Sequence, residues 1–175
     1  MDVSTDANKH EKEILVIKFN STEFVVFITQ IDGIAEFDDR FKKNENVDLW
    51  LGKYYNQTKI IPVLNLKKYL HCPKVVFIPT LQSRILFLSY SAGISPSSDS
   101  LIIGVGIDSI TGFFPSTAFE GKIDMGNILS PELKCFKIHS YIQINTKKYP
   151  YLDLKKLLDF SSLKSILEQL KTENI

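Results

Sequence analysis

One ten-residue stretch occurs twice in this chain, as IPVLNLKKYL at residues 61–70 and as YPYLDLKKLL at residues 149–158. The copies share a proline, a Leu-Asn/Asp-Leu core, a lysine pair and a closing leucine, at an offset of 88 residues. In each copy strand-type apolar residues lead to an Asn or Asp whose side chain can cap a short lysine-rich turn of helix. The repetition predicts a doubled β module. The alternative is two unrelated strand-to-helix junctions, since leucine and lysine are common residues.

The composition is that of a globular protein with a substantial core. The chain has 175 residues, of which 44% are apolar, and this length fits one domain or two small lobes. Its net charge is only +1, and the lysine pairs are scattered along the sequence. Nucleic-acid binding is therefore not expected, because it requires clustered Lys and Arg.

The ends of the chain and its cysteines bear on where the protein works. Residues 1–13 are polar and lack the apolar segment of a signal peptide, so we expect a disordered tail. No window approaches the roughly 20 apolar residues of a membrane-spanning helix, and we expect a cytoplasmic protein. In that compartment Cys72 and Cys135 are expected to be reduced thiols that form neither a zinc site nor a redox pair.

Short apolar runs, rich in β-branched and aromatic residues, predict a mainly β protein. The expected strands are Ile14–Phe19, Phe24–Ile28, Lys59–Leu66, Arg84–Tyr90, Leu101–Ile107, Tyr141–Ile144 and Tyr149–Leu152, the first two forming a hairpin. Several runs are apolar at consecutive positions, as in ILFL at 85–88. Both faces of those strands should therefore be covered, as where two small barrels pack together.

Breaks between the runs predict loops and edges. Pro62 and Pro150 lie inside strand patterns, so each should be at a sheet edge or beside a bulge. We expect a charged loop at Glu36–Asp48, a flexible loop at Ser91–Ser100 and a long connection at Ser116–Glu132.

The C-terminal segment 159–175 predicts an amphipathic helix. Leu163, Ile166, Leu167 and Leu170 follow helical spacing, and Ser161 or Ser162 can cap the start. Burying this face should stabilise the helix on a barrel, although a free interaction helix is the alternative.

No catalytic, metal or cofactor motif is found. Gly104-Val105-Gly106 follows a strand, but Ser109 stands where a nucleotide-binding loop needs a third glycine, and a tight barrel turn explains the glycines better. The three histidines have no metal-ligand spacing, and no serine or cysteine stands in a nucleophile motif. The sequence therefore predicts a protein that is not an enzyme.

The order of segments resembles the CheW-like chemotaxis coupling proteins. The resemblance spans about residues 14–158 and rests on the order and spacing of three pieces. These are IIPVLNL at 60–66, the G-x-x-x-D-x-I pattern of Gly104, Asp108 and Ile110, and LDLKKLL at 152–158.

The resemblance implies a fold and a function. The fold is a pair of intertwined five-stranded SH3-like barrels, here followed by the C-terminal helix. The function is a non-catalytic adaptor that joins the tips of methyl-accepting chemotaxis receptors to the regulatory domain of the CheA histidine kinase, peripheral to the receptor arrays. Other CheW-like adaptors are further expected partners.

The resemblance also implies which residues meet the partners. Ile31, Gly33 and Gly52 would face the kinase, while Gln57, Gly104 and Phe113 would lie at the receptor groove. Ile31 is equally explained as a core residue, and the glycines as ordinary turn residues.

One four-residue stretch and three single residues depart from the family pattern. Tyr55-Asn56-Gln57-Thr58 replaces the usual Asn-Leu-Arg-Gly, so the arginine associated with coupling is missing. Gly33 stands in place of an acidic residue, Ser140 in place of a glycine and Pro150 in place of an aliphatic residue. The altered Gln57 and Thr58 favour one alternative to the full adaptor, an accessory scaffold that binds the kinase but not receptors. A small-ligand-binding β-barrel is a second alternative, of a different class.

Overall fold

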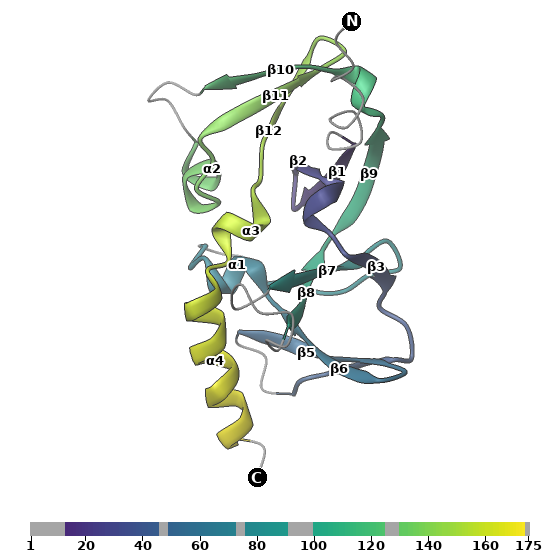
Figure 1. Cartoon of the computed structure of the whole chain (residues 1–175), viewed down its shortest axis with the longest axis vertical. Coiled ribbons are helices and arrows are strands. Elements are labelled where there is room, and N and C mark those ends of the chain that lie inside the picture. Colours follow the sequence, from purple (N-terminus) through teal and green to yellow (C-terminus); the bar gives the residue numbers. More distant parts are fainter. Residues whose placement is uncertain (1–12, 46–48, 73–75, 91–99, 125–129, 174–175) are drawn as a thin grey trace, which may run out of the picture.

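The chain forms two β lobes, and it leaves the upper lobe and later returns to it (Figure 1). The computed structural model describes residues 13–45, 49–72, 76–90, 100–124 and 130–173. The predicted N-terminal tail and most of the loop at 91–100 lie outside these residues. The upper lobe contains the strands β1 (Ile14–Phe19), β2 (Thr22–Phe27), β9 (Ser109–Phe114), β10 (Phe119–Asp124), β11 (Ser140–Ile144) and β12 (Lys147–Pro150).

The lower lobe is built from the intervening segment. Its strands are β3 (Gly33–Glu36), β4 (Phe41–Lys43), β5 (Trp50–Asn56), β6 (Lys59–Leu64), β7 (Arg84–Tyr90) and β8 (Leu101–Ile107). The 3-10 turn η2 (Ile28–Gln30) leads down from β2 to β3, and β8 leads up into β9. The lobes are therefore intertwined, as the resemblance implies.

The sheets are curled and mostly antiparallel. In the described residues the lower lobe is one sheet of order β3-β7-β8-β6-β5-β4, with β6 and β8 parallel. The upper lobe has two sheets, of orders β2-β1-β9 and β10-β11-β12. In the described residues each lobe thus has six strands, one more than the five that the resemblance implies, and β4 and β10 lie in segments that we expected to be loops.

Buried side chains explain why so many apolar residues are consecutive in sequence. In β7, Leu86 and Leu88 face a core cluster shared by the two lobes, while Ile85 and Phe87 face the interior of the lower lobe. In β1, Leu15, Ile17 and Phe19 join the shared cluster, and Ile14 and Val16 the upper interior. Both faces of these strands are covered, so the prediction of two packed layers is confirmed.

The duplicated stretch forms the same local structure in each lobe. The strand β6 leads to α1 (Leu66–Tyr69), capped by Asn65, and β12 leads to α3 (Leu154–Leu157), capped by Asp153. The cap oxygens accept hydrogen bonds from the Lys68 and Lys156 backbone N–H groups at 3.3 and 3.0 Å. Leu66, Leu154 and Leu157 all enter the shared cluster. The two copies therefore meet at the junction of the lobes, where α3 lies above α1 in Figure 1.

This capping geometry predicts a measurable loss of stability. Asp153→Ala removes the acceptor for the Lys156 N–H and should lower the free energy of unfolding by about 1 kcal/mol. Urea unfolding would measure it. Asp153→Asn keeps a side-chain acceptor and serves as the control; equal losses in both variants would contradict the capping role.

The prolines lie where the sequence analysis placed them. Pro62 pairs opposite Lys53, next to the irregularity between Trp50 and Gly52 in β5. Pro150 ends β12, which is an edge strand of its sheet.

Three local predictions were wrong. Gly104 and Gly106 lie within β8 and not in a turn. Glycine is needed there because neighbouring side chains occupy the space above the backbone: a Cβ at Gly104 would lie 2.7 Å from Ile85 Cγ2. The charged loop contains β4, whose Phe41 packs beside the lower interior. The long connection contains the 3-10 turn η3 (Ser116–Ala118), β10 and the start of α2 (Pro131–Cys135).

The expected terminal helix is α4 (Phe160–Glu173). Leu163 is fully buried in the shared cluster, and Ile166 and Leu167 pack against it. The capping residue is Asp159 rather than Ser161 or Ser162, because its carboxylate accepts the Ser162 N–H at 3.1 Å. The same carboxylate accepts the hydroxyls of both serines, and these hydrogen bonds lower the pKa of Asp159.

Candidate docking surfaces

An open groove of about 610 Å³ runs along β3, at the free edge of the lower sheet. Gly33 lines it, and so does Ile34, whose side chain is 47% exposed. The charged residues around the groove are Asp32, Glu36, Asp38, Arg40 and Arg84. Arg40 pairs with Asp38, which lowers the pKa of that carboxyl, and Arg84 pairs with Glu36 at 3.2 Å. The groove thus combines an exposed apolar side chain with a rim of both charges.

Ile31 lies just before this edge but is not a free surface residue. Its side chain is half-buried and packs against the shared core cluster. A contact between Ile31 and the kinase stays a prediction, and Ile34 is the more accessible apolar residue of the same segment.

Gly52 is buried in β5, between the neighbouring strands β4 and β6. A Cβ at this position would overlap the Lys42 carbonyl oxygen, so only glycine fits. Gly52 lines a pocket of about 200 Å³ together with Trp50 and three lysines, Lys42, Lys43 and Lys53. Gly52 therefore shapes a basic surface through its backbone, and a side-chain contact from this position does not exist.

Gln57 lies at the tip of the β5–β6 hairpin, where it is exposed. Its backbone N–H donates to the Asn56 side-chain oxygen at 2.8 Å. Below the tip Tyr55 and Ile60 are paired across the strands and are 43% and 60% exposed. Sequence reasoning missed this apolar pair, although Ile60 is out of phase with the buried Ile61 and Val63 in the alternation of β6.

The remaining two predicted receptor residues differ in accessibility. Gly104 is buried among Ile85, Val63 and Phe87 and offers no side chain to a partner. Phe113, on β9 of the upper lobe, is 55% exposed. Gln57 and Phe113 lie on different lobes, so a receptor that contacts both must extend across the lobe junction.

A charged cluster in the junction links three segments. The Lys67 side chain is only 2% exposed, and its Nζ lies 2.6 Å from Asn20 Oδ1 and 3.2 Å from Asp108 Oδ2. The same Asp108 oxygen accepts the Asn20 backbone N–H. Asp108 stands between β8 and β9, where the chain crosses from one lobe to the other. The cluster therefore fixes that crossing, and it accounts for the aspartate of the G-x-x-x-D-x-I pattern.

The prediction of two free thiols was wrong. Cys72, just after α1, and Cys135, at the end of α2, form a disulfide with a Cα–Cα distance of 5.6 Å. The two residues are 63 positions apart, and only the tertiary fold brings them together. The disulfide ties the upper-lobe helix α2 to the end of the first repeat copy.

Other features bear on the kind of site that the described residues can form. No group of three or more potential metal ligands occurs among the described residues. Within those same residues, no helix has the length and apolar character needed to cross a bilayer. The interiors of both lobes are filled by the buried side chains of their clusters.

Comparison with known proteins identifies the fold. No protein-family model matches the sequence, and no curated protein sequence matches it either. Among solved structures, the scaffolding protein TtCheW from Thermoanaerobacter tengcongensis superimposes with a TM-score of 0.59. The match covers 90% of this chain and 94% of that chain, at 15% sequence identity. The chain has a CheW-like fold.

Within the CheW-like fold the described surfaces occupy distinct places. The β3 groove and the β5–β6 hairpin belong to the lower lobe, and Phe113 to the upper lobe. The buried Gly52 and Gly104 support the CheW-like sheets from inside. Four exposed apolar residues, Ile34, Tyr55, Ile60 and Phe113, lie at these surfaces.

Proposed function

We propose that this chain is a non-catalytic scaffold that couples methyl-accepting chemoreceptors to the regulatory domain of a CheA histidine kinase. The observation that carries the proposal is the CheW-like fold over 90% of the chain, shared with a protein described as scaffolding. The packed interiors of the lobes favour recognition by outer surfaces over a small-ligand-binding barrel. In this role the protein works in the cytoplasm, next to the receptor arrays, where other CheW-like adaptors are further partners.

The β3 groove is the proposed kinase-docking surface. Among the described residues β3 pairs with β7 alone, which leaves its other edge for a partner. Ile34 provides an apolar contact, and the charged rim provides directional contacts around it. The predicted kinase residues Ile31 and Gly33 lie on the same segment.

The hairpin tip of β5 and β6, with Phe113, is the proposed receptor-docking surface. Tyr55 and Ile60 supply apolar area beside Gln57. A neutral glutamine in place of an arginine removes one charge-assisted contact, worth about 1.5–3 kcal/mol. Receptor binding should therefore rely on apolar contacts more than on charge.

The first test is the affinity for the kinase regulatory domain. Ile34→Asp places a charge on the proposed contact and should weaken binding at least about tenfold, because burying an isoleucine contributes about 1.5–3 kcal/mol. Calorimetric titration would measure it. Ile78→Asp, at another exposed position of the lower lobe, is the matched control and should bind like the wild type. Equal affinities for wild type and Ile34→Asp would contradict the assigned surface.

A second arm of the experiment uses a receptor tip, with Ile60→Asp as the variant. If the chain is a coupling scaffold, both partners should bind it. Adding the chain to a mixture of kinase and receptor should then raise autophosphorylation of the kinase. Binding to the kinase alone would identify the accessory scaffold instead. No binding to either partner at tens of micromolar would contradict both.

A further inference from the structure

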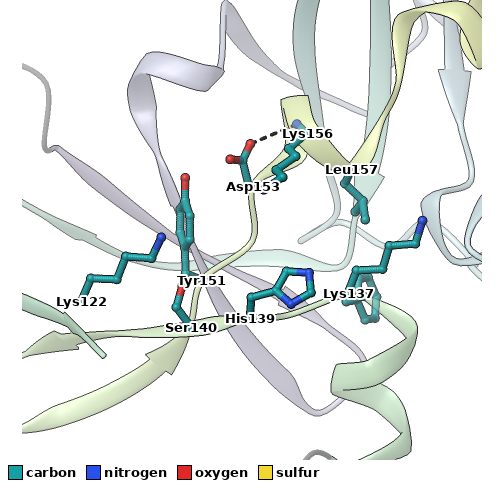
Figure 2. Close-up of a pocket in the computed structure, with 9 residues that line it drawn as sticks. Lys122, Lys137, His139, Ser140, Tyr151, Asp153, Lys156 and Leu157 are labelled. Carbon is teal, nitrogen blue, oxygen red and sulfur yellow. Dashed lines mark hydrogen bonds between the residues drawn. The ribbon is translucent and has the colours of Figure 1, made fainter. Parts of the chain in front are cut away.

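A pocket of about 190 Å³ opens in the upper lobe (Figure 2), and none of the proposed docking residues lines it. Its wall residues come from β10, from the segment between α2 and β11, and from the second repeat copy through α3. These segments are distant in sequence and meet only in the folded upper lobe.

The base of the pocket is apolar. Phe136 and Leu157 are buried in the shared cluster, and the half-buried Tyr151 ring forms one side. The volume is comparable to that of the engineered cavity of about 150 Å³ that admits benzene. A compact ring or short aliphatic body therefore fits the base.

The rim is cationic. Lys122, Lys137 and Lys156 line it together with His139, and all four are exposed. None of the ion pairs between described residues uses these lysines. The Lys122 ammonium lies 5.2 Å from the centre of the Tyr151 ring. Figure 2 shows the two side chains next to each other. The positive charges of the rim thus remain available to an anion.

The single carboxylate in the wall is already used by the fold. Asp153 caps α3 by accepting the Lys156 backbone N–H. The Tyr151 hydroxyl accepts a hydrogen bond from the Gln30 amide at 3.0 Å. Burial raises the pKa of Tyr151 to about 12, so this hydroxyl keeps its proton at neutral pH. With three lysines against one aspartate, the lining carries a net positive charge.

We propose that this pocket binds a small organic anion, with a compact apolar body on Phe136 and Leu157 and a carboxylate or phosphate group among the rim lysines. The apolar base excludes a bare inorganic ion as the best ligand, since such an ion would leave that base unfilled. The rim excludes a neutral hydrocarbon, since it would leave the cations without a counter-charge. The inference does not depend on the proposed scaffold function.

Titration followed by amide chemical shifts tests the proposal, with phenyl phosphate, benzoate and neutral benzyl alcohol as probes. Phenyl phosphate or benzoate should bind saturably and shift the amides of Ser140, Tyr151 and Leu157, and benzyl alcohol should bind more weakly. The double variant Lys122→Gln/Lys156→Gln should weaken binding of the anions about tenfold or more.

Lys155→Gln is the matched control, because Lys155 is the exposed neighbour of Lys156 on α3 but does not line the pocket. It should bind the anions like the wild type. Thermal unfolding of each variant checks that the fold is kept. Three results would overturn the proposal: no saturable binding of either anion, equal binding of benzyl alcohol, or equal losses in the control and the double variant.

Discussion

Reduction of the Cys72–Cys135 disulfide is expected to lower the free energy of unfolding by about 4 kcal/mol, the largest effect that we predict for a local change. The cross-link joins residues 63 positions apart. In the chain-entropy description, a disulfide stabilises by restricting the unfolded chain, and the restriction grows with the length of the closed loop. Because this loop spans β7 through β10, its release frees much of both lobes in the unfolded state.

Thermal unfolding with and without a reductant measures this effect. For a chain of this size the midpoint should fall by roughly 8–16 °C on reduction. The variant Cys72→Ala/Cys135→Ala should show a low midpoint that the reductant no longer changes, which separates the cross-link from side effects of the reagent. Two titratable thiols in the folded, unreduced protein, or an unchanged midpoint, would contradict the disulfide.

Asp108→Ala is expected to destabilise the protein by about 3 kcal/mol, because it leaves the Lys67 ammonium buried without its carboxylate. Lys67 would keep only the Asn20 side-chain oxygen at 2.6 Å as a hydrogen-bond partner in the cluster. Part of Asp108 is reachable by water, with 28% of its side chain exposed, which places the cost at the lower end for a broken buried pair.

A double-mutant cycle separates the ion pair from packing. Lys67→Met keeps most of the side-chain volume and removes the charge, so Lys67→Met/Asp108→Ala should lose less stability than the sum of the single variants. The repeat provides a matched control: Lys155 occupies the equivalent position in the second copy but is exposed, so Lys155→Met should change stability by less than about 0.5 kcal/mol. Additive losses at Lys67 and Asp108 would show that the two charges are not coupled.

Lys67 and Lys155 also show where sequence reasoning stops. In each copy the lysine follows the leucine that comes directly after the helix cap, so the local sequence pattern makes the two lysines equivalent. One is buried against Asn20 and Asp108, and the other faces solvent. The difference arises because the β1–β2 turn and the β8–β9 crossing lie over α1. No pattern near either lysine carries that information.

The residues of the docking surfaces also differ in whether a sequence pattern can reveal their role. Alternation in β6 is a signal that could have singled out Ile60, because this residue is out of phase with the buried Ile61 and Val63. Gly52 and Gly104 resembled surface or turn glycines, but their role depends on atoms of other strands. β4 was missed because it is short and β10 because half of its residues are charged, and both pair through backbone hydrogen bonds that side-chain patterns do not reveal.

The sequence by itself determined the strands with strong apolar runs, the N-terminal hairpin, the terminal helix and the duplication of the capped strand-to-helix unit. These features depend on the spacing of side chains within one segment, because that spacing decides which residues can be buried together and which can cap a helix. Only the tertiary structure decided the disulfide, the buried Lys67–Asp108 pair and the cationic pocket. The disulfide joins residues 63 positions apart, Lys67 and Asp108 are 41 positions apart, and the pocket is lined by three separate segments, so the proximity of these groups depends on how the chain folds.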